Sequence, residues 1–343
     1  MHLVLGLLIF SFCVTSAFIV PFIDMLYRLR FQRQKQKTTD AFGDRATIFD
    51  TYHAHKAGVP VGGGILIILV TSLIYALVYP AMRGLGITTT NVYPLIPELV
   101  ILFFSFWSFG LIGLYDDIKK FFGFKESKFF GLRMRHKLML QLGSALITGS
   151  MMYFWLGINF LHLPFLGQVY LGPAFIAYAA FVIVSFANAV NITDGLDGLA
   201  GGVLLFCLFG LWVLSSSILD TTLSIFIALI IGSLIAFLYF NIYPARIFMG
   251  DVGALALGAV LAVMGLLLGK TIALVIIGGI FVAEIASSLI QLTSKRFRHK
   301  KVFPAAPFHL LLQYIGWEEP KIVMRAWMTG IILTAIGVWL AMI

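Results

Sequence analysis

The chain has 343 residues, of which 60% are hydrophobic and only 11% are charged, and its mean hydropathy is +1.00. This composition excludes a soluble globular domain and indicates a polytopic membrane protein. The net charge is +9, but the basic residues cluster in a few loops, so that membrane orientation explains them without a nucleic-acid partner. The apolar runs follow one another too closely for a separate globular domain, and we expect residues 1–343 to form a single membrane domain.

The first apolar run starts at the amino terminus with no Lys or Arg before it. No clear small-residue cleavage site follows, and we therefore expect a retained first helix and not a cleaved signal peptide. The two cysteines, Cys13 and Cys207, both lie inside apolar runs. Buried thiols are therefore favoured over a disulfide framework or a zinc site.

A helix needs ~20 apolar residues to cross the hydrocarbon core of a bilayer. Ten segments qualify, which predicts an all-α integral membrane protein with spans at 3–27, 58–80, 94–115, 137–157, 170–189, 199–218, 220–240, 252–270, 272–294 and 322–342. The loops after the odd-numbered spans hold 21 of the 24 Lys and Arg residues. The positive-inside rule assigns these loops to the cytoplasm and both termini to the outside of the cell's inner (plasma) membrane.

The segment Pro60–Gly64 opens the second span with three consecutive glycines. A Gly-rich turn at a helix start can bind phosphate, or it can simply let two helices pack closely, and the second interpretation is slightly favoured here. Lys56, just before the segment, is a candidate anion contact.

Asp116 and Asp117 end the third span side by side. Like charges this close raise each other's pKa unless a cation neutralises them, and Mg²⁺ with phosphate oxygens in its shell would do so. The alternative is an ordinary solvated helix end. The following stretch from Lys120 to Lys137 is basic and aromatic, which favours contact with anionic lipid headgroups over nucleic acid.

The segment Asn188–Ala200 follows the fifth span and is the densest polar cluster of the chain. It holds two Asn, two Asp and two Gly but no Lys or Arg, a spacing that favours ligand or metal binding over an ordinary loop. Asp251 lies between glycines at the start of a helix, where it is either a helix cap or a metal ligand.

Glu284 lies inside the ninth span, where an acid either has a function or pairs with a polar group of another helix. His309 lies in the last cytoplasmic loop, and a structural and a catalytic role are equally supported there. Together with His309, five aspartates are expected on one membrane face: Asp116, Asp117, Asp194, Asp197 and Asp251. This pattern predicts a site for a metal ion and a phosphate-bearing substrate on the cytoplasmic side.

Several of these motifs together resemble one superfamily, the polyprenyl-phosphate N-acetylhexosamine-1-phosphate transferases. Within it, the chain is most similar to the phospho-N-acetylmuramoyl-pentapeptide transferase (MraY, translocase I) type, over essentially its whole length. The resemblance is carried by Asp116-Asp117 after Leu-Tyr, the Asn188–Ala200 segment, Phe248-Met249-Gly250-Asp251-Val252-Gly253, and Gly316-Trp317 followed by Glu319-Pro320-Lys321. Ten spans with both termini outside also resemble the family.

This resemblance implies transfer of phospho-N-acetylmuramoyl-pentapeptide from UDP-MurNAc-pentapeptide to undecaprenyl phosphate, giving lipid I and UMP in peptidoglycan synthesis, with Mg²⁺ required. The implied partners are a UDP-linked amino sugar donor, undecaprenyl phosphate, membrane lipids and, as is frequent in the family, a second copy of the chain. No nucleic acid is implied.

The resemblance also implies roles for individual residues, with the active-site cleft on the cytoplasmic face. Asp251 and Asp117 would be metal ligands, and the aspartate pair would position or deprotonate the lipid phosphate. The catalytic positions are Asp116, Asp117, Asp251, His309, Asn191 and Asp194. The substrate-binding positions are Lys56, Lys137, Gly195, Leu196, Asp197, Asn241 and Phe248, with Phe248 placed to stack on uracil.

The chain departs from the family pattern outside the acidic residues. Where the family has three consecutive histidines, this chain has His309 followed by Leu310 and Leu311. The hydroxyls of a Thr-Pro-Thr segment are lost at Val59 and Val61, and a serine after the Asp-Val-Gly motif is Ala254. These losses leave a related transferase that uses UDP-GlcNAc or another UDP-N-acetylhexosamine as an alternative.

Two interpretations from other functional classes stay open. A transporter or flippase would also have many spans and acidic clusters, but its carboxylates would be expected near the middle of the membrane and not at one boundary. A catalytically inactive relative that acts as a scaffold would fit the missing histidines but not the complete acidic set.

Overall fold

The computed structural model describes residues 2–32, 52, 56–87, 89–122, 132 and 134–343. Parts of the predicted basic loops at 28–56 and 119–137 lie outside the described residues. The elements are α1 (His2–Arg28), α3 (Gly63–Gly84), α4 (Leu95–Phe122), α5 (Met134–Leu156), β1 (Phe160–Leu163), β2 (Gly167–Tyr170), α6 (Ala174–Thr193), α7 (Leu199–Ser217), α8 (Thr221–Asn241), α9 (Gly250–Leu267), α10 (Thr271–Ile277), α11 (Gly279–Arg298), α12 (Phe308–Tyr314) and α13 (Glu319–Met342).

The described part of the chain is mostly helical, and eight of its helices are long and apolar enough to cross a membrane. The prediction of a helical, multi-pass membrane protein is thereby confirmed. The pair α10 and α11 meets the same test together, but it is bent by 82° and forms a broken span or a re-entrant segment. The predicted span at 137–157 corresponds to α5, which is not one of the eight helices.

The prediction contained no strands, but residues 160–170 form a two-stranded antiparallel hairpin, β1–β2. Phe160 pairs with Tyr170, and Gly167 adopts a positive φ of 84° at the turn, a conformation open to glycine. The hairpin delays the start of α6 to Ala174, four residues after the predicted start of that span.

Helices α8 and α9 form the centre of the bundle. In the most apolar window of each, 83% and 94% of the residues are buried, against 22% in α1 and in α13. A helix that is apolar on all sides is stable only when other elements surround it. Helix α9 accordingly packs between α4 and α6, and α8 packs against α1 and α3.

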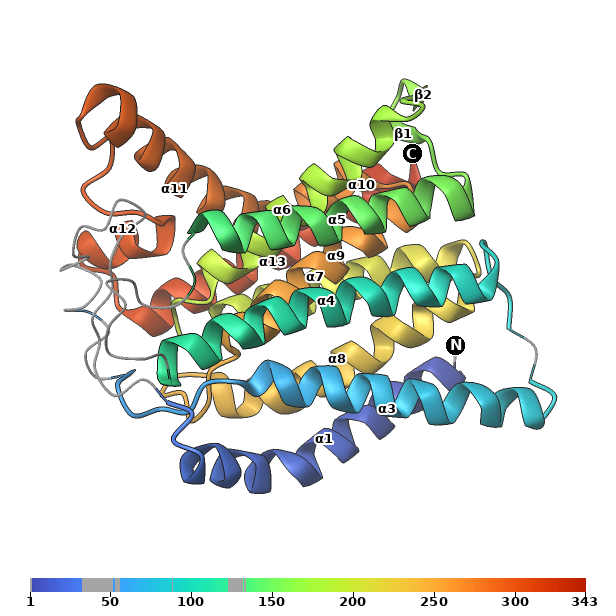
Figure 1. Cartoon of the computed structure of the whole chain (residues 1–343), viewed down its shortest axis with the longest axis horizontal. Coiled ribbons are helices and arrows are strands. Elements are labelled where there is room, and N and C mark those ends of the chain that lie inside the picture. The colour runs from blue at the N-terminus through green and yellow to red at the C-terminus, as the bar shows by residue number, and fades with distance from the viewer. Residues whose placement is uncertain (1, 33–51, 53–55, 88, 123–131, 133) are drawn as a thin grey trace.

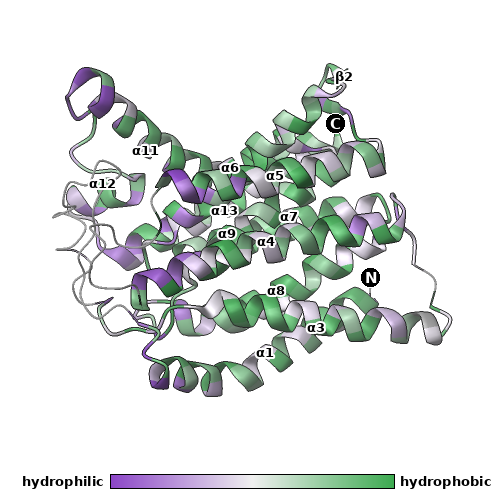
Figure 2. Ribbon diagram, in the orientation of Figure 1, coloured by the Kyte–Doolittle hydropathy of each residue, from purple (hydrophilic) through white to green (hydrophobic). Residues whose placement is uncertain are grey.

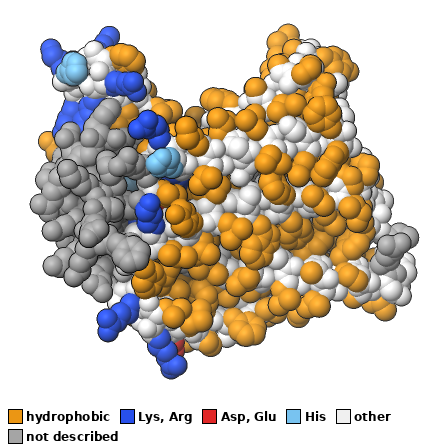
Figure 3. All heavy atoms as spheres, in the orientation of Figure 1, with side chains coloured by type: hydrophobic (Ala, Val, Ile, Leu, Met, Phe, Trp, Pro, Cys, Tyr) orange, Lys and Arg blue, Asp and Glu red, His pale blue; other side chains and the backbone are white. Residues whose placement is uncertain are grey.

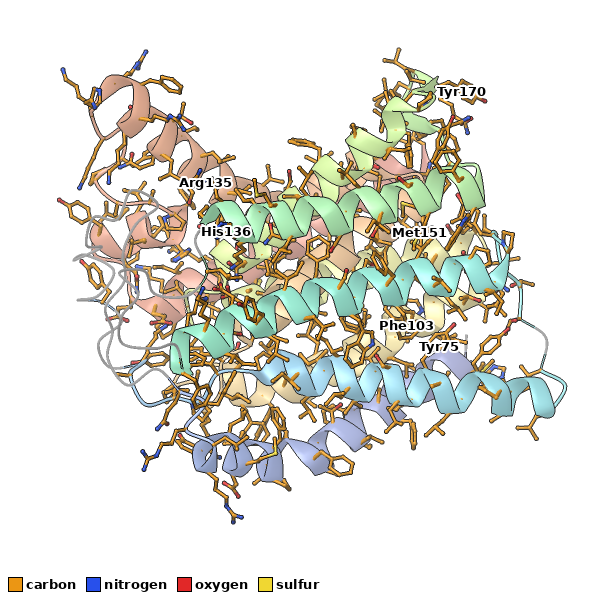
Figure 4. The ribbon with its side chains drawn as sticks, viewed as in Figure 1. Tyr75, Phe103, Arg135, His136, Met151 and Tyr170 are labelled. Carbon is orange, nitrogen blue, oxygen red and sulfur yellow. The ribbon has the colours of Figure 1, made fainter. Side chains whose placement is uncertain are left out.

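Aromatic rings fill the space between α3, α4 and α8. Tyr75 of α3 and Phe103 of α4 lie edge to face with ring centroids 5.4 Å apart (Figure 4). Phe226 of α8 contacts both rings, at 6.2 and 5.2 Å between centroids. Such edge-to-face contacts match the positive ring edge to the negative ring face, so that they favour one relative placement of the three helices.

Polar side chains gather at one end of the molecule. The carboxyl ends of α1 and α4 lie at this end together with α11 and α12, whereas both termini and the hairpin lie at the opposite end (Figure 1). The hydrophilic residues follow the same division (Figure 2). Apolar side chains are widespread over the rest of the described face in view, and Lys and Arg are prominent near α11 (Figure 3). Arg135 and His136, at the start of α5, are exposed at this polar end (Figure 4).

Candidate active site

The acidic cluster lies where α4 ends and α9 begins. Asp116 and Asp117 are on the last turns of α4, and Asp251 is in the first turn of α9. Asp116 and Asp117 are only 3% and 1% exposed. Two helices separated by more than 100 residues in sequence therefore bring three carboxylates to one place at the polar end of the bundle.

Two lysines lie between these carboxylates. Lys120 Nζ is 2.9 Å from Asp251 Oδ2, 3.1 Å from Asp116 Oδ2 and 3.8 Å from Asp117 Oδ1. Lys137 Nζ is 3.1 Å from Asp116 Oδ2 and also forms an ion pair with Asp251 Oδ2. Buried carboxylates require such compensation because desolvated charges of one sign repel strongly.

Backbone N–H groups orient two of the carboxylates. Val252 donates from its backbone N–H to Asp117 Oδ2 at 3.1 Å, and Leu132 donates to Asp116 Oδ1 at 2.7 Å. The residue at the N-cap of α9 is Met249, so that Asp251 is not the helix cap that the sequence left open. Its carboxylate faces the lysines.

Helices α4 and α9 approach closely because Gly113 has no side chain. A Cβ built on Gly113 would lie 2.2 Å from the backbone oxygen of Asp251. Gly113 precedes Asp117 by one helical turn, so that it lies on the same face of α4. The glycine therefore lets the aspartates of α4 reach Asp251.

The donor set of this cluster suits Mg²⁺. Mg²⁺ is bound through oxygen, commonly by one or two carboxylates together with substrate phosphates. Among the described residues, no three His, Cys, Asp or Glu side chains form a metal cage by themselves. With all groups ionised, three carboxylates and two lysines carry a net charge of −1, which favours a cation. Asp251 and Asp117 could hold Mg²⁺ here if phosphate oxygens complete its shell.

Asn191 and Asp194 lie at the carboxyl end of α6, and both are half-buried. Burial, together with the negative charge of Asp251, raises the pKa of Asp194 to about 7. The charge of Lys56 acts in the opposite direction. Asp194 therefore borders the acidic cluster, and a bound cation would favour its charged form.

Lys56 lies close to three of the other predicted substrate-binding residues. Its Nζ lies 2.7 Å from Asp197 Oδ1, 3.2 Å from the Gly195 carbonyl oxygen and 5.8 Å from the centroid of the Phe248 ring. It is also 2.5 Å from Glu319 Oε1. Lys56 is only 8% exposed, and two carboxylates already hold its charge.

Asp197 and Asn241 hold the backbone around them. Asp197 Oδ2 accepts from Ala245 N–H at 2.9 Å, and Asn241 Oδ1 accepts from Gly198 N–H at 3.2 Å. Both residues are at least 96% buried, and Leu196 between the two glycines is 2% exposed. In this structure the three residues therefore stabilise the conformation of the loop after α6 from its buried side.

The glycine segment Pro60–Gly64 is a packing element. The N–H groups of Gly62 and Gly63 both donate to the carbonyl oxygen of Phe248, and Gly64 donates to Met249. These donors are therefore not free for a phosphate. A Cβ on Gly64 would lie 2.1 Å from Gly253 Cα, so that close packing of α3 on α9 requires glycine. The packing interpretation is confirmed.

Lys137 and His309 lie in different surroundings from the Lys56 group. Lys137 belongs to the acidic cluster. His309 is 1% exposed, and its Nδ1 lies 3.0 Å from Glu284 Oε2. A Cβ on Gly195 would lie 2.6 Å from His309 Nε2, so that His309 reaches the loop after α6.

Sequence reasoning did not identify Lys120 as a site residue, named Glu319 only as part of a family motif, and left two alternatives for Glu284. Lys120 follows Asp116 by four residues, a helical spacing that brings the two side chains together and could have identified it. Glu319 Oε1 accepts from Lys56 and, at 2.6 Å, from the backbone N–H of Asp197. No local pattern in the sequence indicates this last contact.

Comparison with known proteins identifies the family of this chain. A sequence model of glycosyl transferase family 4 matches residues 99–269, which include the acidic cluster. The phospho-N-acetylmuramoyl-pentapeptide-transferase of Desulfotalea psychrophila is 39% identical over 82% of this chain and 79% of its own length. The proteins of the same name from Chlamydia felis (32% identity, 96% and 92%) and Staphylococcus aureus (34%, 84% and 87%) are also similar. The chain belongs to the phospho-N-acetylmuramoyl-pentapeptide transferase family.

Proposed function

We propose that the acidic cluster is the active site at which this chain transfers phospho-N-acetylmuramoyl-pentapeptide from UDP-MurNAc-pentapeptide to undecaprenyl phosphate, giving lipid I and UMP. The chain is a membrane-bound transferase of peptidoglycan synthesis. One observation carries the location: Asp116, Asp117 and Asp251 converge on Lys120 and Lys137 at the polar end of the bundle.

The chemistry of phosphoryl transfer fits this cluster. The reaction needs in-line placement of two phosphate groups and neutralisation of their charge, and little covalent participation by the protein. Lys120 and Lys137 provide positive charge, and the carboxylates set the position of both lysines. When bound by Asp251 and Asp117, Mg²⁺ would neutralise further charge on the reacting phosphates.

The donor nucleotide is proposed to bind beside Lys56, Gly195 and Phe248. The Phe248 ring is half-buried, which leaves an apolar face for the uracil base. Lys56 Nζ lies 5.8 Å from the centroid of the Phe248 ring, close enough for a cation–π contact, and it donates a hydrogen bond to Glu319 Oε1. This neighbourhood joins a base-binding surface to a cluster that binds phosphate.

The topology proposed for the chain is ten spans with both termini outside and the active site facing the cytoplasm. Both termini lie at the end of the molecule opposite the acidic cluster, which supports an even number of crossings (Figure 1). The predicted positive-inside bias supports the orientation in the inner membrane. The homodimer stays a prediction of the family resemblance.

The substitutions in the histidine motif keep a second donor under consideration. Leu310 is 5% exposed and Leu311 is half-buried, so that apolar packing stands where the family has two more histidines. A transferase that uses UDP-GlcNAc is therefore the second candidate. The transporter alternative is less well supported, because the three carboxylates lie at one end of α4 and α9 and not along a path through the bundle.

UMP release by the purified protein in detergent tests the proposal. The mixture contains Mg²⁺, undecaprenyl phosphate and either UDP-MurNAc-pentapeptide or UDP-GlcNAc. We expect UMP from the pentapeptide donor. UMP from UDP-GlcNAc alone would indicate that the enzyme takes part in the synthesis of another surface polymer. No UMP from either donor, with a folded sample, would refute the proposed activity. Detergent abolishes sealed compartments, so that a transporter gives no signal in this assay.

A further inference from the structure

Helix α11 has a stripe of buried polar side chains on one face, and these side chains form hydrogen bonds with the segment that follows the helix. Its buried positions include Glu284, Gln291 and Ser294, spaced so that they lie along one face of the helix. Gln291 Nε2 donates to the carbonyl oxygen of Phe303 at 2.9 Å, and Ser294 Oγ donates to that of Lys300 at 2.9 Å. Glu284 is the member of the stripe nearest the start of the helix, and it holds His309.

Glu284 contacts both the backbone and the ring of His309. Its Oε1 and Oε2 accept from the backbone N–H of His309 at 3.0 and 3.3 Å. Its Oε2 also lies 3.0 Å from the ring Nδ1. The two side chains are only 3% and 1% exposed, so that water does not compete for these contacts.

This contact decides which ring nitrogen is free. A carboxylate accepts hydrogen bonds and donates none, so that the Nδ1 atom facing Glu284 carries the proton. The Nε2 atom is buried and has no hydrogen-bond partner among the described residues. Its near neighbour is Gly195, where a Cβ would come within 2.6 Å. Only a glycine at this position leaves room for the ring.

Two polar groups therefore meet Gly195 from two sides. Lys56 Nζ lies 3.2 Å from its carbonyl oxygen, and His309 Nε2 lies next to its α-carbon. Lys56 is engaged by Asp197 and Glu319. Within the part of the chain that the structure describes, His309 Nε2 is a polar atom beside Gly195 that has no hydrogen-bond partner and can contact a substrate.

We propose that Glu284 is a positioning residue that holds His309 with Nε2–H directed at Gly195, where it donates a hydrogen bond to a phosphate oxygen of the donor's diphosphate. A phosphate oxygen only accepts hydrogen bonds, so that this contact requires a proton on Nε2 in addition to the one on Nδ1. The Glu284 carboxylate balances the charge of that doubly protonated ring. The inference rests on the proposed function of this site.

A double-mutant cycle tests the inference. The variants are Glu284→Gln, His309→Ala and both together, with UMP release as the assay. Glutamine is isosteric and keeps an acceptor for the backbone N–H, but it lacks the balancing charge. We expect each single variant to lose roughly 10–100-fold in kcat/KM for the donor, as is typical when a positioning partner is removed, and the double variant to lose no more than His309→Ala alone.

Three readouts separate positioning from a purely structural role. The KM for undecaprenyl phosphate and the melting temperature in detergent should stay at the wild-type values in Glu284→Gln. Glu284→Asp, which keeps the charge, should recover part of the lost rate. The matched control is Glu98→Gln, a change of another fully buried carboxyl group that lies at the opposite end of α4 from the cluster, and it should leave UMP release unchanged.

If the double variant loses the product of the two single-variant losses in kcat/KM, the inference is overturned. A wild-type rate in Glu284→Gln would also overturn it. Equal rates for Glu284→Asp and Glu284→Gln would also overturn it. If the glutamine variant does not fold, Gly195→Ala provides the same test, because its new methyl group displaces the ring; it should cause no further loss in the His309→Ala background. Absence of UMP release by the wild-type protein would instead refute the proposed function.

Discussion

Replacement of Gly113 by alanine should separate the two halves of the acidic cluster. The new Cβ would lie 2.2 Å from the backbone oxygen of Asp251, whereas ordinary contact begins at 3.4 Å. Helices α4 and α9 must therefore move apart by about 1.2 Å, because the obstructing atom belongs to the backbone and no rotamer change can relieve it. A misplacement of about 1 Å can cost on the order of 100-fold in rate.

The effect on stability should be smaller than the effect on rate. Overpacking of this kind costs about 1–3 kcal/mol, and the better helix propensity of alanine returns up to about 1 kcal/mol. We therefore expect Gly113→Ala to be folded, to melt a few degrees lower in detergent, and to release UMP roughly 100-fold more slowly.

A graded series of glycines supplies the controls. Gly143→Ala in α5 places its Cβ where nothing lies within 4 Å, and it should behave as the wild type. Gly110→Ala meets the Ile68 Cδ1 atom at 2.8 Å, the flexible end of a side chain, and it should be milder than Gly113→Ala. Wild-type rates in Gly113→Ala, or equal losses in all three variants, would refute the reasoning.

Three further predictions concern the charged groups of the site. Asp117→Asn and Asp251→Asn should abolish UMP release while the protein still folds, and the exposed Asp24→Asn should not; a near-normal rate in either cluster variant would contradict the assignment. Removal of divalent cations by EDTA should stop UMP release and Mg²⁺ should restore it, whereas undiminished turnover in EDTA would exclude the proposed metal role. Glu319→Gln should raise the KM for the nucleotide donor about tenfold, because Lys56 loses a charged partner worth ~1.4 kcal/mol, with the acceptor KM as the internal control.

The motifs around the aspartates are specific enough to indicate the family from the sequence alone. The comparisons confirm that identification and the transferase activity. Hydropathy also predicted the helical membrane architecture, because each span satisfies its backbone hydrogen bonds locally and leaves a continuous apolar run in the sequence. The assignments of individual site residues stay predictions, although the structure brings Asp116, Asp117 and Asp251 together as expected.

The sequence by itself left open features that depend on neighbours distant along the chain. Glu284 was predicted inside the ninth span, either with a function or paired with a polar group of another helix. The structure bends this span by 82° between α10 and α11 and pairs Glu284 with His309 of α12. The Pro60–Gly64 glycines allowed two interpretations, and the choice between them depends on the carbonyl oxygen of Phe248, which accepts from two of their N–H groups.

The local sequence pattern therefore determined the apolar helices, the acidic residues at their ends and the similarity to one family of transferases. The tertiary structure alone decided which charges face each other. Asp117 and Asp251 are 134 positions apart, and Lys56 and Glu319 are 263 apart. Hydropathy depends on a residue's own side chain and its immediate neighbours, whereas the partner of a buried charge depends on how whole helices pack, which here is governed by glycines such as Gly113 and Gly64.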